Sequence, residues 1–144
     1  MNDRFKFRAY DTDKKLMVYC WSEATEAQKN KYCEIYGKDE SYYCWQSCEL
    51  DCLGEFNNEY NHFIVEQCTG LKDKNGKLIY EGDIVKLSSD REVVCPVVWD
   101  NEETGFCVEY KKELYRFNTY KKYHLIEVIG NIHENIDLIK VGGK

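Results

Sequence analysis

The stretch TGLKDKNGKLIYEGDIVKL, residues 69–87, has the pattern of a β-hairpin followed by a further strand. Asn75-Gly76 separates two short runs, and this dipeptide readily takes the two positive φ angles of a tight type I′ turn. Gly82 marks a second break, before the apolar run DIVKL. The stretch therefore predicts antiparallel strands joined by short turns, and it indicates a mainly β fold.

Further short strands are expected on both sides of this stretch. FIVEQC at 63–68 precedes it, and runs of similar length follow at 92–99, 106–110, 114–117 and 123–132. Strands of this length and spacing are typical of a small antiparallel barrel or an open sandwich. Pro96 lies inside the apolar run EVVCPVVW and cannot donate a ladder hydrogen bond. We therefore expect that strand to lie at a sheet edge or to carry a bulge.

One helix is expected, over residues 23–36. Thr25 and Gln28 have the spacing of a capping box, and Gly37 is suited to the end of the helix. The predicted fold class is mainly β with a minor α+β component, the barrel or sandwich occupying the C-terminal half and the helix the N-terminal half. We expect one domain over 1–144, with a strand or hairpin and the helix at 1–62 and a barrel-like β part at 63–139.

Composition and charge indicate a folded cytoplasmic protein. The chain has 144 residues, of which 43% are hydrophobic and 15% aromatic, so it can form a sizeable core. It contains no apolar run of about 18 residues, which a membrane-spanning helix needs, and its N-terminal sequence MNDRFKFRAYD is charged. We expect no membrane association. Because thiols stay reduced in the cytoplasm, the eight cysteines are interpreted as free thiols.

The cysteine-rich stretch CWQSCELDC, residues 44–52, is the strongest candidate for a metal site. In a helix, Cys44 and Cys52 would lie about 12 Å apart along the axis. In a strand they would lie about 26 Å apart. Zinc holds each sulfur at about 2.3 Å, so neither geometry brings all three cysteines to one ion. Packing of the thiols in the core is favoured over metal binding, and the sequence leaves open whether 42–53 is helix or strand.

Three blocks of the sequence resemble the YopX family, whose members are small proteins encoded mainly by phages and prophages of low-GC bacteria. The blocks are FKFRAYDTDKKLMVY at 5–19, QCTGLKDKNGKLIYEGDIVKL at 67–87 and IEVIGNIHEN at 126–135. The second is the most specific, and residues 20–62 have no counterpart in the resemblance. It implies a mainly β fold with a barrel-like C-terminal part. It implies no established activity and no catalytic residues.

The sequence contains no motif for nucleophilic, zincin or P-loop chemistry. Cys95 or Cys107 would need the fold to bring it beside His124 to form a nucleophile and base. A buried or solvated histidine is the simpler interpretation. The acidic groups on predicted turns are interpreted as solvated side chains: Glu81 and Asp83, and Asp100, Glu102 and Glu103. We expect no catalytic residues, no metal site and no cofactor.

The most suggestive segment for binding is EYKKELYRFNTYKKYH, residues 109–124, here called the basic aromatic segment. Its five basic side chains against Glu109 and Glu113 give it a net charge of +3, in a chain with a net charge of −6. Basic side chains interleaved with aromatic ones hold nucleotides or single strands in small β-barrels. The same alternation also arises in an ordinary strand pair with aromatics inward and lysines outward. The predicted ligand-binding residues are Lys111, Lys112, Tyr115, Arg116, Lys121 and Lys122.

These observations predict a non-enzymatic phage or prophage accessory protein that binds a host or phage protein, or a small anionic ligand. The alternative is a module that binds single-stranded nucleic acid through the basic aromatic segment. An acidic pI near 5.2 disfavours that alternative, because nucleic-acid-binding domains are usually basic. An enzyme of unknown class is the third hypothesis. The sequence leaves open a homo-oligomer.

Overall fold

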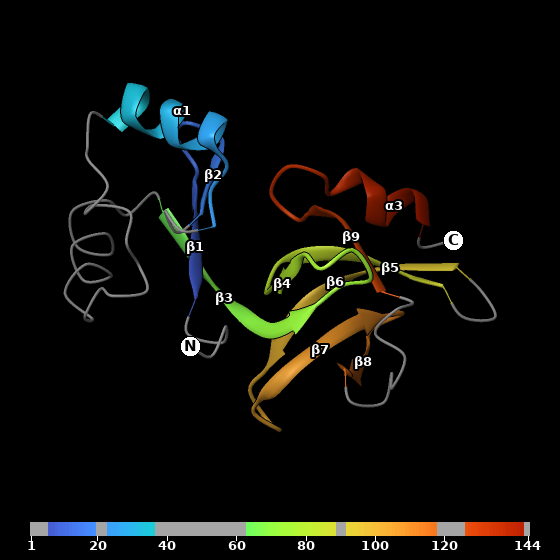
Figure 1. Ribbon diagram of the computed structural model, residues 1–144. Coiled ribbons are helices and arrows are strands. Elements are labelled where there is room, and N and C mark those ends of the chain that lie inside the picture. The colour runs from blue at the N-terminus through green and yellow to red at the C-terminus, as the bar shows by residue number, and fades with distance from the viewer. Residues whose placement is uncertain (1–5, 20–22, 37–62, 89–91, 118–125, 143–144) are drawn as a thin grey trace. The chain divides into compact units, whose positions relative to one another are not determined.

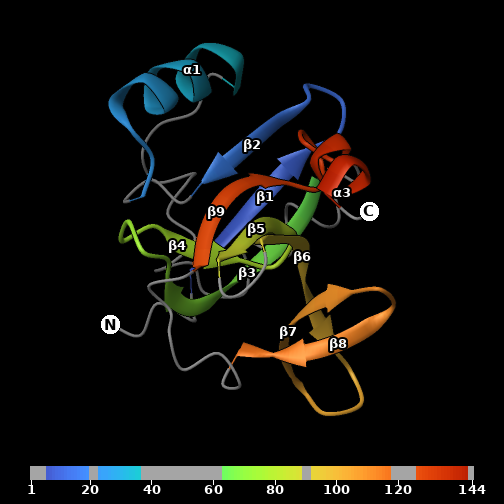
Figure 2. The ribbon, with the colours of Figure 1, turned by 90° about the vertical axis from the view of Figure 1, so that its right-hand side faces the viewer.

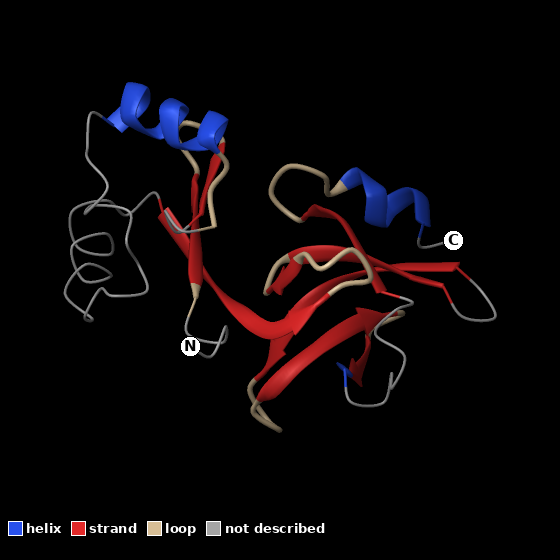
Figure 3. Ribbon diagram, in the orientation of Figure 1, coloured by secondary structure: helices blue, strands red, loops and turns tan. Residues whose placement is uncertain are grey.

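The computed structural model describes residues 6–19, 23–36, 63–88, 92–117 and 126–142 (Figure 1). Strands dominate these residues (Figure 3). In chain order the elements are β1 (Phe7–Asp11), β2 (Leu16–Tyr19), α1 (Glu26–Tyr36), β3 (Phe63–Lys72), β4 (Leu78–Tyr80), β5 (Asp83–Ser88), β6 (Glu92–Asp100), β7 (Gly105–Tyr110), β8 (Glu113–Arg116), β9 (Ile126–Asn131) and α3 (Asp137–Gly142). The prediction of a mainly β fold with one sizeable helix is confirmed.

The chain divides into two compact units. One is Phe5–Gln67, and the other comprises Cys68–Lys144 together with Met1–Arg4. Four strands in the order β2-β1-β3-β4 form one sheet. β1 pairs with the first half of β3, and β4 pairs with the second half. The boundary between the units therefore falls inside β3, and the assignment of 1–144 to one domain stays a prediction.

In the N-terminal unit, α1 begins at the predicted capping box of Thr25 and Gln28. The Thr25 backbone N–H donates to Gln28 Oε1 at 2.8 Å, and the Gln28 N–H donates to Thr25 Oγ1 at 3.2 Å. These two bonds satisfy donors that the first turn of a helix leaves without partners. The predicted helix is confirmed, although it starts at Glu26 and not at residue 23.

Tyr32 of α1 completes the outer edge of β2. Its hydroxyl donates to the Met17 carbonyl at 3.1 Å and accepts the Tyr19 N–H at 3.2 Å. β2 is an edge strand of its sheet, and exposed edge groups invite pairing with other chains. The hydroxyl of one buried side chain thus makes the two bonds that a neighbouring strand would otherwise make.

The C-terminal unit contains a five-stranded antiparallel sheet in the order β8-β7-β6-β5-β9, which curls into a half-barrel (Figure 2). One face carries the core of this unit. The buried core residues are Ile79, Val85, Leu87, Cys95, Val97, Val108, Phe117 and Ile126. The alternation of these residues along β5, β6 and β7 fixes which face of the sheet is turned inward.

The turn between β3 and β4 is a hairpin turn, as predicted, but it is not of type I′. Gly76 has a φ of 80°, whereas Asn75 does not have positive φ. The Gly76 N–H donates to the Asp73 carbonyl at 3.0 Å, and the Asp73 N–H donates to the Lys77 carbonyl at 2.8 Å. This is the pattern of a type I turn followed by one left-handed residue. The type I′ prediction is wrong because a type I′ turn needs two residues with positive φ, whereas this turn has one, Gly76.

Asp73 holds this turn together and fastens it to β9. Its Oδ1 accepts the N–H groups of Asn75 and Lys77 at 2.8 and 2.9 Å, and its Oδ2 accepts the Val128 N–H at 2.9 Å. The Lys74 N–H donates to the Ile126 carbonyl at 2.9 Å. β9 is an edge strand, so these contacts satisfy part of its outer edge.

The two-residue type I′ geometry occurs instead between β7 and β8. Tyr110 pairs with Glu113, and the two residues between them, Lys111 and Lys112, have φ values of 52° and 67°. Non-glycine residues with positive φ are uncommon, and a pair of them at a turn costs conformational energy. The turn presents both lysines at the end of the hairpin, where both are exposed.

Pro96 does not mark an edge strand or a bulge, and that prediction is wrong. β6 lies between β5 and β7 in the sheet, and its registers show no shift. Pairing with β5 extends from Glu92 to Pro96, whereas pairing with β7 begins at Val97. Pro96 therefore lies where β6 changes partners, which is where a missing N–H disturbs the ladder least.

Candidate binding site

The C-terminal unit contains an open groove of about 570 Å³. The residues that line it come from β6, from the end of β7 with its turn, and from the segment that leads into and includes α3. They are Val94, Pro96, Val98, Glu109, Tyr110, Lys111, Ile132, Ile136 and Ile139. The volume lies in the range of small-molecule and peptide sites, and the lining is mostly aliphatic, as such sites usually are.

The sequence of β6 explains why this groove exists. Cys95 and Val97 face the core, so Val94, Pro96 and Val98 lie on the opposite face by the alternation of a strand. β6 is therefore apolar on both faces, and its second face needs a cover. α3 contacts β6 but is only six residues long. The groove is the part of this apolar face that α3 leaves open.

Two charged side chains, Glu109 and Lys111, lie at the end of the groove formed by β7 and its turn. Glu109 pairs with Leu114 of β8, and it follows Val108, the register partner of Val97. Glu109 thus lies beside Leu114, one residue beyond the end of the pairing between β6 and β7.

Neither charged side chain of the groove is neutralised by a neighbour. The Lys111 ammonium lies 5.3 Å from the centre of the Tyr110 ring, which is a cation–π distance. Neither Glu109 nor Lys111 forms an ion pair with any residue in the described part of the chain. An acidic and a basic group are therefore both available to a bound molecule.

The structure separates the predicted ligand-binding residues. Lys111 and Lys112 lie together at the β7–β8 turn, but Arg116 lies about 13 Å away along β8. Arg116 Nε donates to Glu103 Oε2 at 2.9 Å, and its Nη2 donates to the Glu103 carbonyl at 2.8 Å. Arg116 therefore contacts the β6–β7 turn at the other end of the hairpin from the two lysines.

Of the other predicted ligand-binding residues, Tyr115 is half-buried against the core of the unit, and its hydroxyl donates to Glu113 at 2.7 Å. Lys121 and Lys122 lie outside the described residues. Of the predicted residues that are described, only Lys111 lines the groove. The apolar lining was missed by sequence reasoning, although the doubly apolar pattern of EVVCPVVW was a signal for it.

A family model described as "YopX protein" matches residues 6–140. The chain belongs to the YopX family. The crystal structure of protein EF1440 from Enterococcus faecalis is similar to it, with a TM-score of 0.55 and 24% identity over 93% of this chain and 96% of that one. Protein yopX from Bacillus subtilis is 27% identical over 56% of this chain and 62% of that one, with a TM-score of 0.42. A search of curated proteins found no match.

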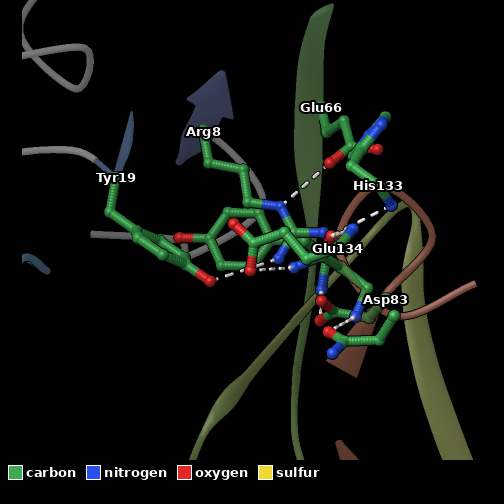
Figure 4. A network of polar contacts seen from close by, with 9 residues as sticks. Arg8, Tyr19, Glu66, Asp83, His133 and Glu134 are labelled. Carbon is green, nitrogen blue, oxygen red and sulfur yellow. Dashed lines mark hydrogen bonds and ion pairs between the residues drawn. The ribbon is translucent and has the colours of Figure 1, made fainter. Parts of the chain in front are cut away.

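The first YopX block contains a buried ion pair. Arg8 of β1 is the register partner of Tyr19 on β2 and of Glu66 on β3. Its Nε donates to Glu66 Oε1 at 3.0 Å, and its Nη1 donates to the Tyr19 hydroxyl at 3.4 Å (Figure 4). The side chains of Arg8 and Glu66 are only 1% and 5% exposed. The pair and the Tyr19 hydroxyl therefore link three strands of the N-terminal unit, and the buried pair does not present a site to solvent.

The other two YopX blocks supply turns. The second contains the Asp73 turn, and also Asp83, which is buried and accepts the Tyr80 N–H at 2.8 Å. In the third, Asn135 Oδ1 accepts the Asn131 N–H at 3.1 Å, and a Cβ on Gly130 would come within 2.6 Å of that same oxygen. The YopX blocks thus build the frame, whereas most residues that line the groove lie outside them.

Burial affects the thiols of both cysteines that the sequence offered as nucleophiles, Cys95 and Cys107. Cys95 is buried, and burial raises the pKa of its thiol to about 12. Burial also raises the pKa of Cys107, with a further increase from Asp100. His124 lies outside the described residues. Thiols with raised pKa values are poor nucleophiles near neutral pH.

The described part of the chain contains no group of three His, Cys, Asp or Glu side chains placed to hold a metal ion. CWQSCELDC lies outside that part, so its metal and secondary-structure predictions stay predictions. No described helix is long and apolar enough to cross a membrane.

Proposed function

We propose that this YopX protein is a non-enzymatic accessory protein, encoded by a phage or prophage, that acts in the host cytoplasm by binding another protein through the groove between β6, β7 and α3. The observation that carries the proposal is the apolar lining of this groove, with Glu109 and Lys111 available at one end. Exposed apolar surface with polar groups at its rim is a recognised feature of protein-binding sites.

A protein partner is favoured over the small anionic ligand that the sequence also allowed. Apolar surface continues from the groove to its surroundings, since Ile136 in the lining is 43% exposed and Leu114, which does not line the groove, is 46% exposed. A small molecule would leave much of that surface uncovered. A small anion would also meet Glu109 beside Lys111, which weakens its attraction to the lysine.

The nucleic-acid alternative has less support. Tyr110 and Tyr115 pack against the core of the C-terminal unit, and Phe117 is part of that core, so their rings are not free platforms for base stacking. Arg116 is paired with Glu103. What remains of the described basic aromatic segment is a turn with two exposed lysines, which can contact phosphates without reading bases.

A matched pair of variants tests the proposed function. Ile136 lines the groove, whereas Leu138 is 38% exposed on α3 and does not line it. The protein and the variants Ile136→Glu and Leu138→Glu would each be immobilised and exposed to host lysate, and the retained proteins identified by mass spectrometry. We expect a host protein to be retained by the wild type and by Leu138→Glu, but not by Ile136→Glu.

Circular dichroism and thermal melting would first establish that both variants fold. Equal retention of every host protein by the two folded variants would contradict a role for the groove. A nucleic acid retained by the wild type and released by a modest increase in salt would favour the alternative.

A further inference from the structure

The charges of Glu109 and Lys111 determine which groups a molecule bound in the groove must carry. Glu109 is exposed, pairs with Leu114 and lines the same groove as Pro96, so an apolar partner that covers this surface removes water from a carboxylate. A buried charge without a partner is costly, far more than a surface charge is stabilising. The covering molecule must therefore bring a cation to Glu109.

The same reasoning applies to Lys111, less strictly. Its ammonium already lies over the Tyr110 ring, and this contact offsets part of the cost of dehydration. An acidic group on the partner would offset the rest. Glu109 and Lys111 are two residues apart, so their Cα atoms are separated by about 7 Å. The partner's basic and acidic groups need a similar separation, which residues two apart in a strand or three to four apart in a helix provide.

Resting on the proposed function, we infer that the occupant of the groove is a short apolar segment of another protein that carries a basic residue opposite Glu109 and an acidic residue opposite Lys111. The aliphatic residues Val94, Pro96, Val98 and Ile136 contact its apolar side chains. The two charges fix the direction in which the segment lies, because reversing it would place like charges together.

A random library of short peptides displayed on a carrier provides the test. Peptides would be selected on the intact wild-type protein, and the affinities of the selected peptides then measured on variants. We expect selected peptides with an apolar centre, a lysine or arginine, and an aspartate or glutamate at the stated spacing. Ile136→Glu should weaken their binding by more than about tenfold, and Leu138→Glu should leave it unchanged.

Charge exchange tests the inference separately from the proposed function. Glu109→Lys and Lys111→Glu should each weaken the selected peptides by about tenfold or more, and the double exchange should recover binding to peptides whose own two charges are exchanged. Glu102→Lys, in the exposed β6–β7 turn outside the groove, is the matched control and should have no such effect.

The outcomes are distinguishable. Peptides that depend on Ile136 but are indifferent to both charge exchanges would overturn this inference and leave the proposed function standing. Selection of no peptide, or only of peptides indifferent to Ile136→Glu, would overturn both. Self-association of the wild type that Ile136→Glu removes would identify a second copy of this chain as the occupant, and it would overturn the inference of a different protein.

Discussion

Replacing Asp73 with alanine should destabilise the protein strongly, although the residue lies in a turn. Asp73 is 7% exposed, and its carboxylate accepts three backbone N–H groups. Hydrogen bonds to a charged group contribute about 1.5–3 kcal/mol each where the donors cannot reach water. The donors at Asn75 and Lys77 lie in an exposed turn and are rehydrated in the variant. The donor at Val128 is half-buried on β9.

The loss for Asp73→Ala is therefore about 2–4 kcal/mol, most of it from the Val128 bond and from the detachment of the turn from β9. For a chain of this size that corresponds to a fall in Tm of about 6–12 °C. Urea denaturation followed by circular dichroism measures the free energy of unfolding directly.

Asp73→Asn is the matched control for this prediction. The amide keeps one acceptor oxygen for the turn donors, but it presents an NH2 group to the Val128 N–H. Because the variant keeps only the turn bonds and loses the Val128 bond, its loss should approach that of the alanine variant without exceeding it. A loss below about 0.5 kcal/mol for Asp73→Ala, the usual range for surface substitutions, would refute the reasoning. So would an asparagine variant that is less stable than the alanine one.

Three further outcomes are expected. Gly76→Val should cost about 1 kcal/mol or more in urea denaturation, wholly from backbone strain, because a Cβ there meets no atom within 4 Å at a φ of 80°. Among the described cysteines only Cys33 is exposed, so thiol labelling at neutral pH with peptide mapping should modify it well before Cys68, Cys95 and Cys107. A hydrogen bond from Lys74 lowers the pKa of Glu127. The ionised Glu127 therefore stabilises the fold fully above the ordinary carboxyl pKa, and this stabilisation is lost as the pH falls. Glu127→Gln should make the free energy of unfolding less dependent on pH on the acid side.

The sequence predicted those parts of the fold in which a residue type strongly favours one backbone conformation. The helix cap at Thr25, the hairpin at Gly76 and most strand positions follow from such local rules. The turn types did not follow. Asn75-Gly76 is the preferred type I′ dipeptide, yet Asp73 satisfies the turn donors and only one left-handed residue is used. Lys111-Lys112 takes the type I′ geometry without glycine, because the alternation of core residues on β7 and β8 fixes a two-residue loop.

The candidate site was less predictable because it depends on distances between elements. The charge of the basic aromatic segment predicted a binding site there. In the structure, Arg116 is paired with Glu103, and Tyr115 packs against the core. The groove depends on how far α3 extends over β6, which no local pattern encodes. The apolar residues on both faces of β6 were the one indication of the groove in the sequence. They predict that the second face of β6 is covered, but not how much of it is covered.

Tyr32 anchors α1 to β2 through its hydroxyl. It is the one buried residue among the described side chains of this helix, residues 26–35, and the others there are polar or exposed. Release of its hydroxyl from Met17 and Tyr19 would loosen this anchor without breaking the ladder between β1 and β2. Segments held by few buried contacts open locally at low free energy. The amides of α1 should therefore exchange with solvent through local opening, long before those of the strands that it borders.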